Sequence, residues 1–273
     1  MTTVTLPTSL RVEPEETGFK DVVAAEWIKF RTVASTRWTL LAAWAGTIAV
    51  GLIVSAAIAA QWKQMSTADK ASLDPTFRSL TGLVVGQLAV GILGVLVITS
   101  EYATGLIRST LAAVPRRRQV LAAKTVALAA PTLVIATLAS VAAFVGGQAL
   151  LSSTGKGVSL GSAAEVRAVV GGGVYLTLLA LLGLGLGAVF RRTAGAIAAF
   201  VGLVLVLPAV IGPLPKPWGR DIVQFLPADA GQAFVQIHTG AASLPPWVGI
   251  GVLGAWVAAT LASAAWLITR RDA

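Results

Sequence analysis

The chain has 273 residues, of which 56% are hydrophobic and 12% charged, whereas an average soluble domain carries about 25% charged residues. A globule of this length must still cover itself with polar surface, so the composition excludes an ordinary soluble domain and indicates a membrane protein. The formal net charge is +9, but the basic residues occupy short segments between apolar blocks, which argues against nucleic-acid binding and fits membrane topology.

The first segment, residues 1–19, is polar and acidic and contains Pro7 and Pro14. It lacks a basic region followed by an apolar run, so it does not resemble a cleaved signal peptide. We expect a flexible cytoplasmic tail here.

Residues 20–37 are predicted to form an amphipathic helix before the first apolar block. Four apolar residues recur at i, i+4, i+7 and i+11 and share one helical face: Val23, Trp27, Phe30 and Ala34. Lys29 is expected on the far side and Arg31 at the edge of that face. A helix of this kind lies on the cytoplasmic leaflet of a membrane. The alternative is an ordinary basic flank that only sets the topology.

Six apolar blocks are long enough to cross a bilayer, which needs roughly 20 residues of helix. They contain no Asp, Glu, Lys, Arg or His, and they cover residues 38–60, 80–99, 125–151, 168–190, 193–212 and 247–269. Only Arg191 and Arg192 separate the fourth block from the fifth. The sequence thus predicts an all-α integral membrane protein with about six spans. Residues 20–273 would form one transmembrane domain.

Lys and Arg are twice as frequent in one set of alternate segments as in the other. The richer set holds the N-terminal segment, residues 100–124, Arg191 with Arg192, and the C-terminal end. The positive-inside rule then places both termini in the cytoplasm. Within the blocks, Gly82 with Gly86 and Gly183 with Gly187 have the spacing that lets helices approach closely, either within the chain or between subunits.

The loop at residues 101–124 carries a second candidate helix. Its mostly apolar stripe consists of Leu106, Ile107, Thr110, Leu111 and Val114. Pro115 is expected to end this helix, and Arg116–Arg118 follow. An exposed apolar stripe is a candidate docking surface for another protein. The alternative is a helix packed flat on its own bundle.

Residues 213–246 form a long loop with six prolines. It is moderately apolar, and two interpretations stay open. In the first, part of the segment dips into the outer leaflet of the membrane. In the second, the whole segment is a proline-stiffened surface loop.

The chain resembles the permease subunit of a type-2 ABC transporter of the actinobacterial kind. The resemblance rests on AEWIKFRTVASTRWTLLA at residues 25–42 and on EY..G.IR.TLA.VPRR..VLAAK from Glu101. RRTAGAIA after the fourth block and the C-terminal ITRRDA add to it. The six-span layout matches over nearly the whole length.

This resemblance implies an exporter in a bacterial cell membrane, built from two identical or related permease copies and two ABC ATPase subunits. ATP and Mg²⁺ would bind to the ATPase partner, with no cofactor in this chain. A surface helix would border the ATPase through Val23, Trp27, Phe30 and Arg31. A coupling helix at about residues 103–114 would rest in an ATPase cleft. The coupling segment would include Glu101, Gly105, Leu106, Ile107, Arg108, Leu111, Pro115 and Arg116. Residues 214–236 would form short re-entrant helices.

No motif indicates that this chain is itself an enzyme. The only Gly-Lys pair is followed by Gly157, so no Walker A loop is present. Cysteine is absent and His238 is the only histidine, which argues against zinc chemistry and histidine-based catalysis. Asp229 with His238 and Ser152 could be assembled into a hydrolase set, but their spacing does not support one.

Two other functions stay open. An ion-coupled secondary transporter usually has ionisable residues within its spans, and here the notable polar ones are Gln87 and Gln148. The second open function is that of a membrane scaffold or immunity protein that transports nothing. The wall of Leu, Val, Ala and Gly suits an amphiphilic or lipid-like cargo, and it equally suits contact with the bilayer.

Overall fold

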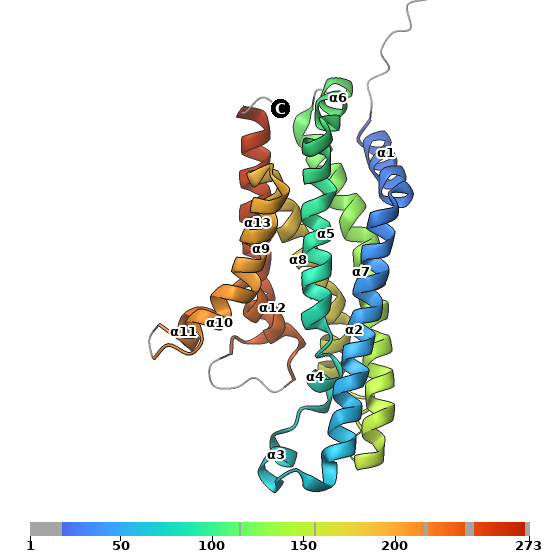
Figure 1. The fold of residues 1–273 in the computed structure, drawn as a ribbon, viewed down its shortest axis with the longest axis vertical. Coiled ribbons are helices and arrows are strands. Elements are labelled where there is room, and N and C mark those ends of the chain that lie inside the picture. Colours follow the sequence, from blue (N-terminus) through green and yellow to red (C-terminus); the bar gives the residue numbers. More distant parts are fainter. Residues whose placement is uncertain (1–17, 115, 156, 216–217, 238–242, 271–273) are drawn as a thin grey trace, which may run out of the picture.

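The computed structural model describes residues 18–270, except 115, 156, 216–217 and 238–242. The predicted tail at residues 1–19, His238 and Pro115 therefore lie outside the described residues, apart from Gly18 and Phe19. Every regular element in the described part is a helix. The long helices run side by side along the longest axis of the molecule (Figure 1).

Among the described residues, six helical runs are long and apolar enough to cross a membrane, which confirms the predicted all-α membrane fold. They are α2 (Ala34–Gln61), α5 (Leu83–Thr104), α7 (Arg117–Leu151), α8 (Ala163–Phe190), the run α9 (Thr193–Val201), η4 (Gly202–Val206) and α10 (Leu207–Ile211), and α13 (Pro246–Arg270). Several helices extend beyond the apolar blocks. The amphipathic helix α1 (Phe19–Thr32) precedes them and ends at an extended residue, Val33.

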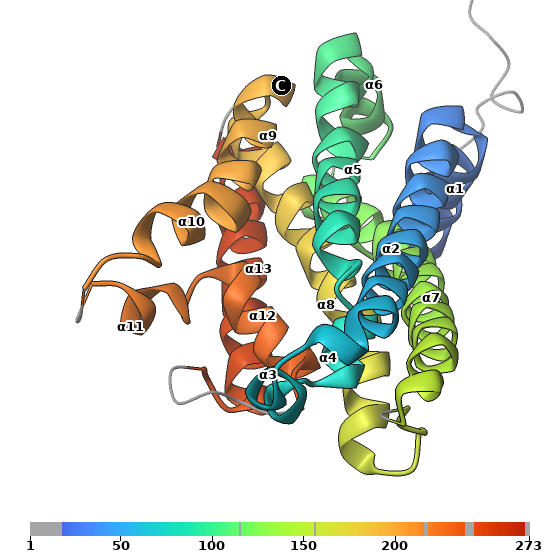
Figure 2. The same ribbon diagram turned by 60° about the horizontal axis from the view of Figure 1, so that its bottom comes forward.

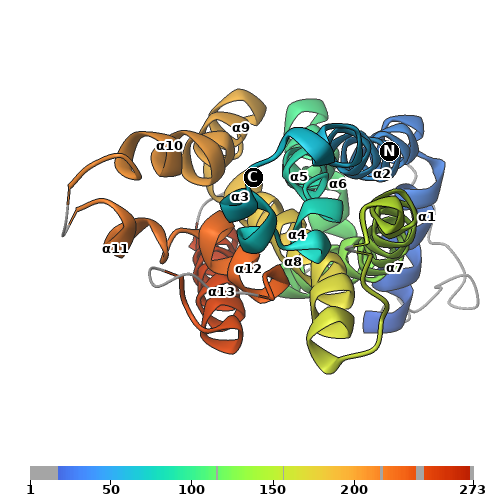
Figure 3. The same ribbon diagram turned by 90° about the horizontal axis from the view of Figure 1, so that it is seen from below.

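Helix α8 lies at the centre of the bundle, against α5, α7 and α13 (Figure 3). Glycines permit the close approach of α5 to α8. A Cβ atom at Gly94 would lie 1.9 Å from the carbonyl oxygen of Ala180, and one at Gly183 would lie 2.1 Å from that of Gly91. On the other side of α5, a Cβ atom at Gly82 would lie 1.8 Å from the carbonyl oxygen of Thr47. The small-residue spacing therefore serves packing within this chain.

Short helices mark the two ends of the bundle. We call the end with α6 (Leu106–Ala113) and the last turn of α13 the α6 end, and the opposite end, with α3 (Thr67–Ser72), the α3 end (Figures 1 and 2). The other short elements are η2 (Trp62–Gln64), α4 (Pro75–Ser79), η3 (Ser152–Thr154), α11 (Arg220–Val223) and α12 (Pro227–Val235). Ser66 caps α3, Asp74 caps α4 and Ser162 caps α8 through their side chains.

Part of the proline-rich segment, helix α12, packs into the bundle. Helix α12 packs against α8 and α13 and buries Ala230 and Phe234. The fifth span is mostly exposed, with 17% of its most apolar window buried, and with α11 it lies at one side of the bundle (Figure 3). The interpretation of residues 213–246 as surface loop alone is therefore wrong, since α12 is part of the helical packing.

Candidate functional site

Four charged side chains meet at the α6 end of the bundle. Lys124 Nζ of α7 lies 2.7 Å from Glu26 Oε2 of α1 and 2.5 Å from Glu101 Oε1 of α5. Lys29 Nζ lies 2.8 Å from Glu26 Oε1 and 3.1 Å from Glu101 Oε1. We call these residues the four-charge network. It joins the surface helix to two spans.

Three members of the network are buried, Lys29 is half-buried, and the formal charges balance. Lys124 is only 2% exposed, and Glu26 and Glu101 are also buried. Burial disfavours the charged form of Lys29, but hydrogen bonding and attraction to Glu26, and then to Glu101, outweigh it and raise the pKa of this ammonium. A buried ion pair is costly to break, because the remaining charge loses its partner while it stays out of water. The network should therefore hold α1, α5 and α7 in a fixed relation.

Helix α1 presents a charged face to the bundle. Val22 and Glu26 are buried and Lys29 is half-buried. Lys29 thus lies away from the apolar stripe, as predicted, but this side of α1 faces the bundle and pairs with Glu26 and Glu101. The apolar stripe marks the neighbouring face of α1. The face toward the bundle carries Glu26, because Lys124 of α7 is buried opposite it.

The predicted surface-helix residues lie beside that inward face. Trp27 is 39% exposed and stacks on Phe30 with ring centroids 6.1 Å apart. Phe30 packs against the core, Val23 is half-buried and Arg31 is exposed. The two aromatic rings thus line the outer edge of α1, where a membrane surface or a partner could cover them.

Helix α6 folds back at a sharp corner. Gly105, with φ of +73°, separates α5 from α6 and permits this left-handed conformation without the steric cost of a Cβ atom. Ile107 and Leu111 are buried against Val120 of α7. Ile107 and Leu111 of the apolar stripe are thus packed on the bundle and do not form the exposed docking surface that the sequence pattern suggested, whereas Leu106 is exposed.

The outward side of α6 has a different character. Leu106 is 54% exposed, and Arg108 and Ser109 are also exposed. On the half-buried side, Thr110 Oγ1 lies 3.5 Å from Lys29 Nζ, which brings α6 to the edge of the four-charge network.

The predicted coupling residues therefore divide into two groups. Glu101, Ile107 and Leu111 are buried, whereas Gly105, Leu106, Arg108 and Arg116 are exposed, and Pro115 lies outside the described residues. Sequence reasoning missed Glu26 and Lys124 as site residues. Lys124 could have been found, because it directly precedes the third apolar block on the same predicted side of the membrane as Glu101, which follows the second block. No such signal marks Glu26.

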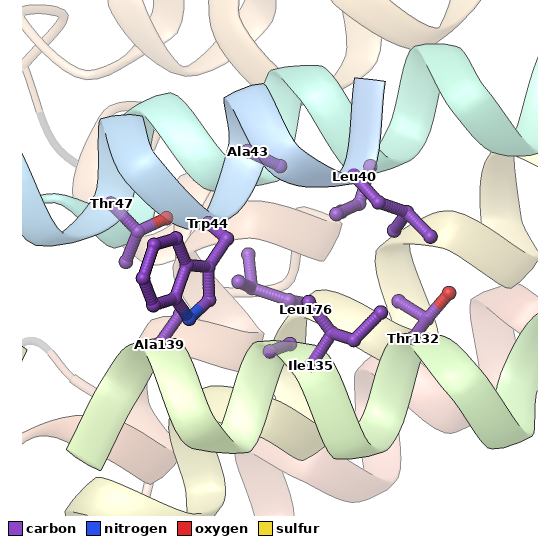
Figure 4. A pocket seen from close by; sticks show the side chains of 10 residues that line it. Leu40, Ala43, Trp44, Thr47, Thr132, Ile135, Ala139 and Leu176 are labelled. Carbon is purple, nitrogen blue, oxygen red and sulfur yellow. The ribbon is translucent and has the colours of Figure 1, made fainter. Parts of the chain in front are cut away.

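A small apolar crevice lies between α2 and α7 (Figure 4). Its lining includes Leu40 and Trp44 from α2 and Ile135 from α7. Its volume of about 10 Å³ is close to that of a single water probe. This crevice is too small to hold a substrate.

The six apolar runs define a multi-pass α-helical membrane protein. The chain matches no family model and no curated protein.

Proposed function

We propose that this chain is the permease subunit of an ATP-binding cassette exporter. The supporting observation is the four-charge network, which joins α1 to α5 and α7 and lies beside α6. Helices α1 and α6 are the two segments for which the sequence resemblance implies ATPase contact. A force applied to α6 would thus reach two spans through buried ion pairs instead of through a flexible loop.

In this proposal the α6 end faces the cytoplasm, in accord with the bias of Lys and Arg. The ATPase, with ATP and Mg²⁺, contacts the exposed side of α6 at Leu106, Arg108 and Ser109 and the outer edge of α1. Closure of two ATPase subunits pushes on α6 and tilts the spans of two permease copies, which moves an amphiphilic or lipid-like cargo outward. The buried stripe of α6 holds this helix on its own bundle so that the push is transmitted.

A tagged chain purified from its native membrane tests the proposal. We expect a stoichiometric partner subunit that has a Walker A motif and hydrolyses ATP. Arg108→Asp should reduce its recovery, because the substitution reverses the charge on the exposed side of α6. Lys63→Asp, at the α3 end, is the matched control and should retain the partner. Recovery without an ATPase, or equal behaviour of the two variants, would refute the proposal.

One observation favours a second candidate, an ion-coupled transporter. Glu101 and Lys124 lie in helical runs that are long and apolar enough to span a membrane. Glu101 Oε2 is buried without a hydrogen-bond partner among the described residues. Reconstituted vesicles separate the two functions. Transport that requires ATP and persists without an ion gradient supports the exporter, and the reverse dependence supports the alternative.

A further inference from the structure

A larger cavity lies between the fifth span and α12, away from α6. Its volume is about 660 Å³, within the range of about 300–1,000 Å³ that is typical of small-molecule sites. Pro208 of α10 contributes to one wall. The polar residues that line the cavity are Gln224, Asp229, Gln232, Gln236 and Ser243. Such a set is unusual in a chain with so few polar residues in its spans.

Among the described residues that line this cavity, Asp229 alone carries a charge. No described side chain forms an ion pair with it, and burial raises the pKa of its carboxyl group. An acidic residue in the first turn of α12 complements the helix dipole. The helix dipole alone, however, does not account for a cavity beside the carboxylate of Asp229. A half-buried anion without a described counter-charge would gain most from a cation placed in the cavity.

The cavity wall is connected to the centre of the bundle. Gln232 Nε2 of α12 lies 3.5 Å from the hydroxyl of Tyr175 in α8, and that hydroxyl donates to Gln87 Oε1 of α5. Tyr175 is 0% and Gln87 is 2% exposed. This chain of polar groups links Gln232 in the cavity wall to the buried centre of the bundle.

The fifth span departs from regular α-helix just before the cavity. Residues Gly202–Val206 form a π-helix, and Pro208 follows in the first turn of α10. Such π-helical segments are frequent at functional sites. This irregularity therefore agrees with a binding role for the wall that α10 provides.

We propose that this cavity binds a small organic cation whose ammonium group pairs with the carboxylate of Asp229. The side-chain amides of Gln224, Gln232 and Gln236 can donate hydrogen bonds to polar substituents and accept hydrogen bonds from them. A single carboxylate among amides in a cavity of this volume suits an organic amine better than a bare metal ion, which needs several oxygen ligands close together. The assignment of the cation as exported cargo rests on the proposed function, whereas the binding site does not.

Dansylcadaverine, a fluorescent primary amine, and its neutral N-acetylated counterpart are suitable probes. Each is titrated into the full chain in nanodiscs of zwitterionic lipid, with empty nanodiscs as the blank. We expect saturable binding of the amine and at least about tenfold weaker binding of the acetylated probe, since a hydrogen-bonded charge pair is lost. This comparison uses the unaltered chain, so it does not depend on the folding of a variant.

Asp229→Asn should weaken amine binding by about tenfold or more, without effect on the acetylated probe. The matched control is Asp69→Asn, which removes an exposed carboxylate of α3 and should leave both affinities unchanged. Equal binding of the two probes, an unchanged affinity of the Asp229 variant, or no saturable binding would overturn the proposal.

This test uses no ATPase, so its outcome is separate from that of the proposed function. A chain that binds the amine but never pairs with an ATPase keeps the cation site and loses the exporter function. A chain that pairs with an ATPase but does not distinguish the probes keeps the exporter function and loses the cation site.

Discussion

Lys124 is the residue on which the α6 end depends most. It is 2% exposed, and its ammonium group contacts Glu26 of α1 and Glu101 of α5. One side chain of α7 thereby holds two acidic residues from separate elements. If it were removed, both carboxylates would stay buried and only Lys29 would neutralise them.

We therefore predict that Lys124→Met lowers the free energy of unfolding by roughly 3 kcal/mol or more, as expected when one partner of a buried ion pair is removed. Denaturant unfolding in a fixed detergent measures this change. Lys63→Met, at an exposed position, is the control and should leave stability unchanged. In the background Glu26→Gln the same substitution should cost less, because the two residues are coupled. Equal losses in both backgrounds would contradict the network.

The face of α1 shows how far sequence reasoning about single residues reaches. The apolar recurrence of Val23, Trp27 and Phe30 located the helix correctly, but it gave no sign that the neighbouring face, with Val22 and Glu26, packs on the bundle. Periodicity assumes that burial is apolar, whereas Glu26 is buried because a lysine from α7 lies opposite. That lysine is 98 residues further along the chain, and no local pattern reveals such a pairing.

Among the elements, α5 and α8 are held together by small residues. Their spacing is visible in the sequence, whereas the backbone atoms that they accommodate are visible only in the structure. Gly183 leaves room for the carbonyl oxygen of Gly91, to which a Cβ atom would lie at 2.1 Å. Such a contact excludes even an alanine without movement of one helix.

We predict that Gly183→Ala destabilises the protein by about 1–3 kcal/mol, the usual cost of overpacking. Gly251→Ala in α13 is the matched control, because no heavy atom would lie within 4 Å of a Cβ atom at that position. That change should leave stability equal or slightly higher, since alanine favours a helix over glycine. Thermal unfolding of the two variants in the same detergent measures the difference. Equal melting temperatures would contradict the α5–α8 contact.

Helix α6 illustrates what an amphipathic pattern leaves open. The stripe of Ile107 and Leu111 predicted a helix with one covered face. It did not decide whether the bundle or a partner covers that face, because an apolar stripe suits either. In the structure the stripe packs on the bundle, and Leu106, Arg108 and Ser109 stay outside.

For the molecule as a whole, the six spans were predictable because bilayer thickness sets the length of an apolar helix. The packing of α12 was not, since proline marks turns and helix starts but does not tell what a segment packs against. Helix α12 and the cavity beside it became visible only once Asp229 and Gln232 were placed against α8 and the fifth span.

The exporter proposal requires that the α6 end engages an ATPase, and site-specific crosslinking can detect this contact. The chain contains no cysteine, so one introduced thiol gives a unique attachment point for a photoreactive maleimide. Ser109→Cys places it on the exposed side of α6. Ser72→Cys is the matched control, because this serine is also exposed, lies in a short helix at the α3 end, and donates to the carbonyl oxygen three residues earlier, as Ser109 does. We predict an adduct with an ATP-hydrolysing subunit from position 109 and none from position 72; equal adducts from both, or none from position 109, would show that the α6 end is not the ATPase contact.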